Sequence, residues 1–311
     1  MKPADREEGE RLSAALRELR RALPMPGISH PKRLEVLVEQ IIESLRRNEY
    51  IQRLRGRDLP SSSADPNSPT FDPLMAAIRH AKAGAVDDAC WMVFLYVHFG
   101  KHRTGGWRYA SNVFGKLGQG GAWDWAAISR DVPAFRNWLD RNQVELRRRD
   151  IPGGFGNHRK YESLAGWSPA GTGEVVASYV ALILGRGGHA ALLASLKSAR
   201  TPEEAFEALY QELRRVHRFG RTAAFDYSML ISKLAIAEVR PGHSYLEGAT
   251  GPLSGARALF GTDAHGHQRS AKELRPHVAR LQEALGVSFD VVEDALCNWQ
   301  KSPGSFKPFR G

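Results

Sequence analysis

Cysteine is scarce in this sequence, because only Cys90 and Cys297 occur among its 311 residues. Two cysteines so far apart exclude a disulfide framework and a cysteine-based zinc site, and both are expected to be buried thiols. No run of about 18 apolar residues occurs, which excludes a membrane-spanning helix. The first residues, MKPADREEGE, also lack the apolar stretch of a secretory signal. We therefore expect a cytoplasmic protein that makes no membrane contact.

The signature motifs of several enzyme classes are also missing. The sequence has no His-Glu-x-x-His pattern, and the pair His265 and His267 has no third ligand nearby. Two imidazoles alone rarely form a metal site, so no metal is expected. No Gly-x-Ser-x-Gly motif occurs, which disfavours a serine hydrolase, and no Gly-Lys-Ser/Thr ending marks a nucleotide P-loop. No cofactor is expected either.

Lysine is scarce relative to arginine, with 11 lysines and 33 arginines making up the 44 basic residues. Against 34 acidic residues they give a net charge of +10. A basic surface favours a polyanionic partner, and the guanidinium group pairs with phosphate oxygens and stacks on bases. A GC-rich genome would also enrich arginine whatever the function. The charge therefore favours nucleic acid as the partner without establishing it.

Helical periodicity runs through most of the chain, and no alternating strand pattern or long repeat persists. The sequence therefore predicts an all-α fold. The segment LPSSSADPNSPT, residues 59–70, has no periodicity and is typical of a linker or a long surface loop. It would separate an N-terminal helical pair, residues 1–58, from a larger helical domain, residues 71–311, that would carry the active site. Helices are expected at about 5–23, 32–54, 72–83, 86–99, 107–117, 131–148, from 173 onward, and at 202–217, 222–238, 268–285 and 289–300.

The segment from Cys90 to His102 is expected to begin as a buried helix and to end in basic side chains. Cations at a helix C-terminus are ordinary partners of the helix dipole. Several large rings follow in the sequence, however. Rings beside cations can stack on an unpaired base, although aromatic residues are also common in protein cores. His98, Lys101 and Trp107 are therefore candidates for contact with a base or a phosphate.

The irregular stretch from Ile151 to Gly171 contains the segment richest in chemically active side chains, GGFGNHRKYE. Long loops inside compact domains are uncommon and are often functional. Glycines let the backbone approach a ligand closely, and the polar side chains beside them can donate to phosphate or to a base edge. The candidate DNA- or base-binding residues here are Asn157, His158, Arg159, Lys160 and Tyr161.

A second glycine-rich turn, LEGATGPLSGARALFG, is expected to open a helix at Ser254. Unpaired backbone N–H groups at a helix N-terminus bind anions. Gly248, Gly251 and Gly255 are therefore candidates for a backbone clamp on a DNA phosphate. The turn is similar to a helix-hairpin-helix turn with one extra residue. A plain turn between two helices is the alternative.

Asp226 is the candidate catalytic residue. It lies in FGRTAAFDYSML, a segment predicted to be helical with apolar flanks. A carboxylate in such a place is either paired with a cation or retained for function. Lys233, two helical turns further on and on roughly the same face, is either that partner or a second functional group.

Four segments, taken in order, resemble the α-glutamyl/putrescinyl thymine pyrophosphorylase family in its third clade: WMVFLYVHFGKH, GGFGNHRKYES, FGRTAAFDYSML and LEGATGPLSGARALFG. The resemblance spans about residues 85–262. It implies a distant helical relative of the helix-hairpin-helix DNA glycosylases that acts on hypermodified pyrimidines in double-stranded phage DNA. Some bacterial relatives look like antiphage glycosylases that remove a bulky base such as glucosylated hydroxymethylcytosine. The name of the family, in contrast, describes the replacement of a pyrophosphate on a hydroxymethyl pyrimidine by an amine.

From these observations we expect a monofunctional DNA glycosylase of antiviral defence, which flips out a hypermodified pyrimidine and leaves an abasic site. No lysine aligns with the nucleophile of the strand-cleaving glycosylases. Asp226 would stabilise the oxocarbenium charge on the sugar and orient the attacking water. The alternatives are a transferase that exchanges pyrophosphate for an amine, and a non-catalytic DNA-binding module.

Overall fold

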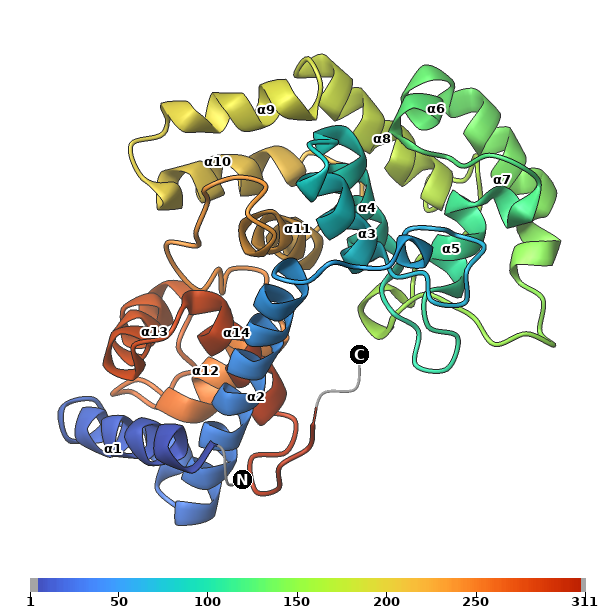
Figure 1. Cartoon of the computed structure of the whole chain (residues 1–311). Helices are drawn as coiled ribbons and strands as arrows, with labels where there is room; N and C mark the ends of the chain where they lie inside the picture. Colours follow the sequence, from blue (N-terminus) through green and yellow to red (C-terminus); the bar gives the residue numbers. More distant parts are fainter. Residues whose placement is uncertain (1–4, 309–311) are drawn as a thin grey trace. The chain divides into compact units, whose positions relative to one another are not determined.

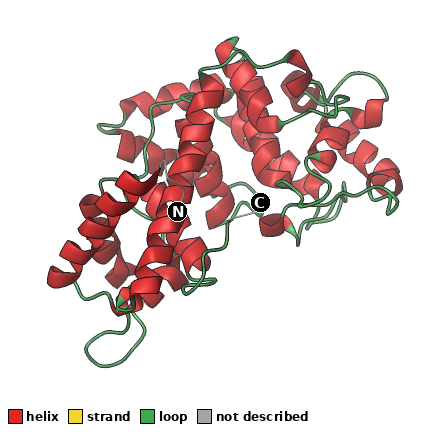
Figure 2. Ribbon diagram, turned by 60° about the horizontal axis from the view of Figure 1, so that its bottom comes forward, coloured by secondary structure: helices red, strands yellow, loops and turns green. Residues whose placement is uncertain are grey.

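The computed structural model describes residues 5–308, apart from the side chain of Asn157. Within that range the chain forms helices, loops and three isolated bridges but no strand, as Figure 2 shows. The expectation of an all-α fold is confirmed. No single described helix is long and apolar enough to cross a membrane, although the bent pair Thr172–Gly185 and His189–Ser198 passes that test by length and composition alone.

The described chain divides into two compact units. The terminal unit holds residues 5–50 and 241–308, and the central unit holds residues 51–240. The first and the last described residues thus belong to one unit. This division differs from the expected boundary at residues 59–70, and a catalytic role for residues 71–311 as one domain stays a prediction.

The terminal unit is held together by apolar helix faces from both ends of the chain. Leu12 and Leu16, one turn apart on the first helix, belong to the same buried cluster as Leu274 and Val278. Burial of such faces supplies most of the stability of short helices. The helices of this unit are α1 (Arg6–Ala22), most of α2 (Pro31–Arg55), α12 (Gly251–Phe260), α13 (Ala271–Leu285) and α14 (Phe289–Trp299), with the 3-10 turn η2 (Pro26–Ile28).

The central unit is built around α4 (Val86–Phe99), which is buried on nearly every side, as expected of a helix with so many apolar residues. The other helices of this unit are α3 (Pro73–Lys82), α5 (Arg108–Phe114), α6 (Trp125–Arg130), α7 (Val132–Leu146), α8 (Thr172–Gly185), α9 (His189–Ser195), α10 (Pro202–Leu213) and α11 (Arg221–Lys233), with the 3-10 turns η3 (Ser61–Ser63), η4 (Lys116–Gly118), η5 (Asn157–Arg159) and η6 (Leu196–Ser198). Figure 1 shows α4 beside α3, with α11 on one flank and α5 on the other.

A chain of polar groups, buried apart from the half-exposed Asp87, joins four helices of the central unit. Nδ1 of His189, at the start of α9, donates to Asp87 Oδ1 at 2.7 Å, and Nε2 accepts from the Tyr179 hydroxyl, also at 2.7 Å. The Tyr179 oxygen lies 2.9 Å from the hydroxyl of Tyr227. Burial lowers the pKa of His189, which favours the neutral imidazole that can donate and accept at once. These bonds fix the position of α11 against α4, α8 and α9.

Three predicted helices end earlier than expected, and two of them end where the backbone becomes left-handed. The helix predicted at 222–238 ends at Lys233, because Ala235 adopts a left-handed φ of +54° and closes it. The helix predicted at 107–117 ends at Phe114, because left-handed residues follow in the next turn. Such terminations depend on single backbone angles and are poorly predicted from periodicity.

The start of α10 follows the sequence closely, whereas its end does not. The Thr201 hydroxyl accepts the Glu204 N–H at 3.2 Å, and Pro202 occupies the first helical position. The helix stops at Leu213 instead of near residue 217. The N-terminal capping signal therefore predicted where the helix begins but not where it ends.

Residues 59–70 form a packed surface loop within the central unit. The side chain of Ser63 is buried, and its carbonyl accepts the N–H of Asp72 at 3.0 Å. The Ser111 hydroxyl on α5 donates to the Pro66 carbonyl at 2.7 Å. Since backbone carbonyls of the loop accept hydrogen bonds from the N-cap of α3 and from α5, the loop is not an open tether.

Candidate active site

Asp226 is the exposed residue of an otherwise buried stretch of α11. Its neighbours Phe225 and Tyr227 are buried, whereas 46% of the Asp226 side chain is exposed. Its carboxylate accepts no hydrogen bond from the described part of the chain. A carboxylate on a core helix with unoccupied lone pairs is available to a ligand or to a reacting group.

A basic group close to Asp226 is Arg159, which lies in the long loop before α8. Its Nη2 is 4.0 Å from Asp226 Oδ2, which is too long for a hydrogen bond. Its Nε donates to the Val97 carbonyl near the end of α4 at 2.8 Å, and the side chain is 13% exposed. The guanidinium is therefore held by α4 and faces the carboxylate without occupying its oxygens.

Surrounding groups shift the pKa of the Asp226 carboxyl in opposite directions. The enclosing protein raises its pKa above the ordinary value, and four basic side chains oppose that rise without cancelling it. A raised pKa makes the carboxylate a stronger proton acceptor. The same positive charges can attract the phosphates of a nucleic acid. The four basic side chains are Arg159, Arg221, His158 and Lys233.

A second ion pair anchors the loop that carries Arg159. Glu162 accepts from Nε and Nη2 of Arg218 at 3.1 and 3.3 Å, a two-point geometry that fixes both groups. Arg218 lies just before α11 and has a left-handed φ of +58°. The loop is thus tied to the segment that enters α11, which restricts the separation of Arg159 and Asp226.

The glycines of this loop serve the packing of the protein itself. A Cβ atom at Gly156 would lie 2.9 Å from the backbone of Gly100, and one at Gly105 would lie 2.5 Å from Gly153 Cα. The Gly156 N–H donates to the Phe99 carbonyl at 2.7 Å. We expected these glycines to admit a ligand, and the structure shows the loop backbone packed against the end of α4 and the following turn.

His98 is a core residue of α4. Its Nε2 lies 2.9 Å from Thr172 Oγ1, and that hydroxyl donates to the Ser163 carbonyl at 2.8 Å, so the imidazole N–H must donate to the threonine. Burial and nearby arginines lower the pKa of His98 to about 3. A neutral, buried imidazole positions α8 against α4, and this placement does not favour the predicted contact with DNA.

Trp107 is also placed in the core. Its indole N–H donates to Asp72 Oδ2 at 3.0 Å, and its ring centre lies 4.8 Å from that of Tyr96. Trp123 and Trp125 are buried as well. The rings that we considered as a stacking surface therefore form core contacts, the alternative that the sequence had left open.

The remaining candidates of the loop and of the α4 end are exposed. Lys101, His158 and Lys160 are at the surface, and Tyr161 is 79% exposed. The ammonium of Lys160 lies 5.0 Å from the centre of the Tyr161 ring, which is within cation–π range. The side chain of Asn157 lies outside the described residues.

The three glycines of the second turn belong to the terminal unit, whereas Asp226 belongs to the central unit. The helix begins at Gly251, three residues before the expected Ser254. A Cβ at Gly255 would lie 2.2 Å from the Leu296 carbonyl oxygen, so this glycine permits close contact of α12 with α14. Gly248 has a left-handed φ of +74°. A phosphate clamp at this helix N-terminus stays a prediction.

Sequence reasoning missed Glu162, Arg218 and Arg221 as neighbours of the candidate site. Arg221 begins α11, where a positive charge opposes the helix dipole, and its guanidinium lies 4.5 Å from the centre of the Phe225 ring. An arginine at an unfavourable helix position was a usable signal. No comparable signal pairs Glu162 with Arg218, because the two residues are distant in sequence.

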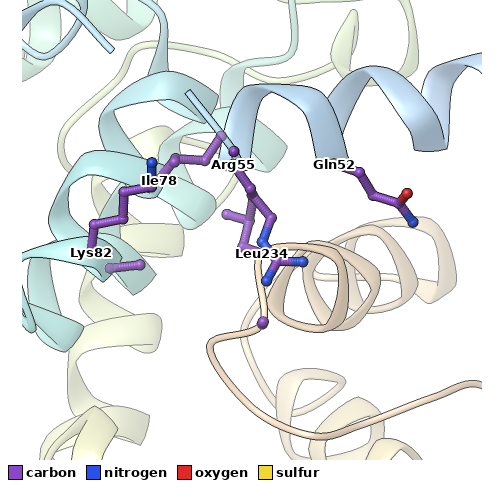
Figure 3. Close-up of a pocket in the computed structure, with 8 residues that line it drawn as sticks. Gln52, Arg55, Ile78, Lys82 and Leu234 are labelled. Atoms are coloured by element: carbon purple, nitrogen blue, oxygen red, sulfur yellow. The ribbon is translucent and has the colours of Figure 1, made fainter. Parts of the chain in front are cut away.

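Figure 3 shows a cavity of about 470 Å³ in the same unit, but Asp226 is not among the residues that line it. The Arg55 guanidinium donates to the Lys233 carbonyl at 3.2 Å, and Lys82 Nζ donates to the Arg57 carbonyl at 2.6 Å. These cations satisfy carbonyls at or just beyond helix ends, which is their usual structural role. The open carboxylate of Asp226 is therefore the stronger candidate. The cavity is lined by Gln52, Arg55, Gly56, Ile78, Ala81, Lys82, Leu234 and Ala235.

Comparison with known protein families matches residues 32–311 to the family described as alpha-glutamyl/putrescinyl thymine pyrophosphorylase clade 3. The match covers most of the chain, with the whole central unit and the part of the terminal unit that follows residue 31. Searches of curated proteins and of solved structures gave no significant match. In residues 5–308, no cluster of three or more histidine, cysteine or acidic side chains could hold a metal ion.

Proposed function

The chain belongs to the alpha-glutamyl/putrescinyl thymine pyrophosphorylase family, clade 3, and on that premise we propose that it is a monofunctional DNA glycosylase. It would flip a hypermodified pyrimidine out of double-stranded phage DNA and excise it, leaving an abasic site. An abasic site blocks copying of the invading DNA, which suits a role in antiviral defence. The family description itself points to an enzyme of modified-thymine chemistry.

The observation that carries this proposal is the open carboxylate of Asp226. Excision breaks the bond between C1′ of the sugar and the base nitrogen, and the electron pair leaves with the base. Positive charge develops on the sugar, where an adjacent carboxylate stabilises it. Water then adds to C1′, and its proton passes to the Asp226 carboxylate. The raised pKa of Asp226 favours that transfer.

The basic groups around Asp226 support a nucleic-acid substrate. His158 and Lys160 are exposed in the loop, and Arg159 and Arg221 lie beside the carboxylate. A flipped nucleotide brings its phosphates with it, and basic side chains offset their charge. Arg159 would in addition keep Asp226 ionised for the reaction, since its charge lowers the pKa that burial raises.

The first prediction concerns Asp226→Asn, which keeps the size of the side chain and removes its charge. Purified protein is incubated with phage DNAs that carry different hypermodified pyrimidines and with unmodified DNA. We expect the wild type to release a free modified base and to leave matching alkali-labile sites, detected by mass spectrometry and gel analysis. The variant should be slower by about 10²- to 10⁴-fold, the contribution typical of such a group.

Binding of the same DNA serves as the control for this experiment. Asp226→Asn should bind at least as tightly as the wild type, because it removes a negative charge that faces the phosphates. A wild-type protein that binds DNA but never releases a base would contradict the glycosylase and favour the non-catalytic module. Full activity of Asp226→Asn would remove Asp226 from the mechanism.

The printed family description favours a second candidate, a transferase that displaces pyrophosphate from a 5-hydroxymethyl pyrimidine with an amine. Here the carbon–oxygen bond to pyrophosphate breaks while a carbon–nitrogen bond forms, and Asp226 would take the proton of the amine. The surrounding cations would hold the pyrophosphate. Release of pyrophosphate from intact DNA, only when an amine is supplied, would identify this activity in the same assay.

A further inference from the structure

The loop before α8 carries a second exposed ring, Trp167, that the proposed chemistry does not use. Its side chain is 50% exposed, whereas the other six tryptophans are buried or partly buried. Large aromatic side chains that only fill space are normally covered. An exposed indole therefore calls for a separate explanation.

The Trp167 ring is held in a fixed orientation by α7. Its indole N–H donates to Asn137 Oδ1 at 3.0 Å, and the guanidinium of Arg136 lies 4.0 Å from the ring centre. The adjacent peptide is held as well, because the Gly166 N–H donates to Asp140 Oδ1 at 2.7 Å and Arg136 Nε donates to the Gly166 carbonyl at 2.8 Å. The ring is therefore rigid as well as exposed.

Close packing of the backbone supports this description. A Cβ atom at Gly166 would lie 2.0 Å from the carbonyl oxygen of Arg136, so only glycine lets the loop approach α7 this closely. Rigid, preoriented aromatic side chains lose little entropy when they bind a partner, which makes them effective contact residues.

A cation lies beside each of the two exposed rings of the loop, and the one over Trp167, Arg136, is also paired with Glu174 at 2.7 Å. Arg136 covers one side of Trp167, and Lys160 stands 5.0 Å from the centre of the Tyr161 ring. His217 Nε2 donates to the Pro169 carbonyl at 2.7 Å, which places a further imidazole beside the loop. Exposed rings interleaved with cations are typical of surfaces that bind unpaired nucleotides.

We propose that Trp167 is a stacking surface for an unpaired base of the bound DNA strand. This inference rests on the proposed function, since it takes DNA as the ligand, but it does not depend on Asp226 or on the reaction. The faces of a base within a duplex are covered by its neighbours, so only an unstacked base can lie on the indole. The protein should consequently prefer DNA that contains unpaired nucleotides.

The test measures the affinity of the full chain for three unmodified, fluorescently labelled DNAs: a single strand, a duplex with a one-nucleotide bulge, and a fully paired duplex. The wild type should bind the first two more tightly than the third. Trp167→Ala should weaken binding to the first two by about 5- to 100-fold, the loss of one base–aromatic stack, and should leave the paired duplex unchanged.

Two further variants make the test specific to the ring. Trp167→Phe keeps an aromatic face, so it should retain most of the preference for DNA with unpaired nucleotides. This variant keeps the test valid even if Trp167→Ala loosens the loop. Leu184→Ala removes another side chain of the central unit that is also 50% exposed, and it should bind all three DNAs like the wild type. Circular dichroism and thermal melting check that each variant is folded.

The outcomes separate this inference from the proposed function. Equal binding of the three DNAs by the wild type, or an equal loss on all three DNAs in Trp167→Ala, would overturn the stacking role. Base release from modified DNA is read in a different assay with a different substrate. A protein that excises bases while Trp167→Ala keeps its full preference would retain the proposed function and lose the stacking surface.

Discussion

At the scale of single residues, the decisive feature is that the Asp226 carboxylate has no hydrogen-bond partner among the described residues. Other polar side chains around the site do have such partners. Glu162 is bound at two points by Arg218, and His98 is bound to Thr172. Each of these groups contributes to stability through the partner it binds. Asp226 has only the charges of four basic side chains, among them Arg159 at 4.0 Å, so the fold gains little from it and a reacting group can use its oxygens.

The raised pKa of Asp226 leads to a prediction about stability. Because its pKa is higher in the folded than in the unfolded chain, the ionised carboxylate disfavours folding once the pH exceeds the unfolded value, about 3.9. Asp226→Asn should therefore raise the free energy of unfolding at pH 7. We expect a gain below about 1 kcal/mol, since the side chain is half exposed and screened by water.

Denaturant unfolding at several pH values checks this prediction. The advantage of Asp226→Asn should shrink toward zero as the pH falls below about 3, where the Asp226 carboxyl is protonated in both the folded and the unfolded chain. Asp150→Asn is the control, and its effect on the free energy of unfolding should have the opposite sign. Arg148 lowers the pKa of Asp150, so the ionised carboxylate of Asp150 favours folding. A variant at Asp226 that is less stable than the wild type at pH 7 would show that the carboxylate has a structural partner.

At the scale of helices, glycine determines how closely two elements approach. On α12, the missing side chain of Gly255 brings the helix against the Leu296 carbonyl of α14, and Gly251 leaves room for the sulfur of Cys297. The four-residue spacing places both glycines on one face of α12. The glycine pattern that suggested an anion clamp thus has a packing explanation in the fold.

Gly255→Ala should destabilise the protein by about 1–3 kcal/mol, because the added methyl group overlaps a backbone oxygen that cannot rotate away. Gly185→Ala, at the end of α8, is the matched control. A Cβ there meets nothing within 4 Å, so the same substitution should be neutral or stabilise by up to about 1 kcal/mol. Thermal unfolding of the two variants compares them, and equal effects would contradict the packing role of Gly255.

At the scale of the whole molecule, the chain leaves the terminal unit at residue 50 and returns to it at residue 241. The central unit, with Asp226, Arg159 and Trp167, is therefore an insertion between two halves of one core. Apolar helix faces from both halves belong to one buried cluster. The terminal unit consequently needs both ends of the chain in order to fold.

A chain that lacks residues 1–50 tests this arrangement. Leu274, Val278, Leu281 and Leu285 of α13 would lose buried partners on α1, at a cost of about 1.5–3 kcal/mol for each apolar side chain of α1 that is removed. We expect residues 241–308 to become protease-sensitive and helix content to fall by more than the missing residues account for. Persistent protection of α13 and α14 in limited proteolysis would refute the shared core.

The sequence by itself determined the local features of this protein. Apolar residues at helical spacing specify an all-α chain, and the Thr201 cap places the start of α10, because such signals act within a few residues. Family membership was likewise readable from short ordered motifs, as the match to residues 32–311 shows.

Only the tertiary structure decided which side chains meet. It placed Trp107 and His98 in the core, assigned the loop glycines to packing, and brought Arg159 to 4.0 Å from Asp226. No local pattern encodes these contacts, since they depend on how α4, α8 and α11 pack around shared buried groups. The packing of α11 also covers one face of the helix and leaves Asp226 partly exposed, although its neighbours Phe225 and Tyr227 are buried.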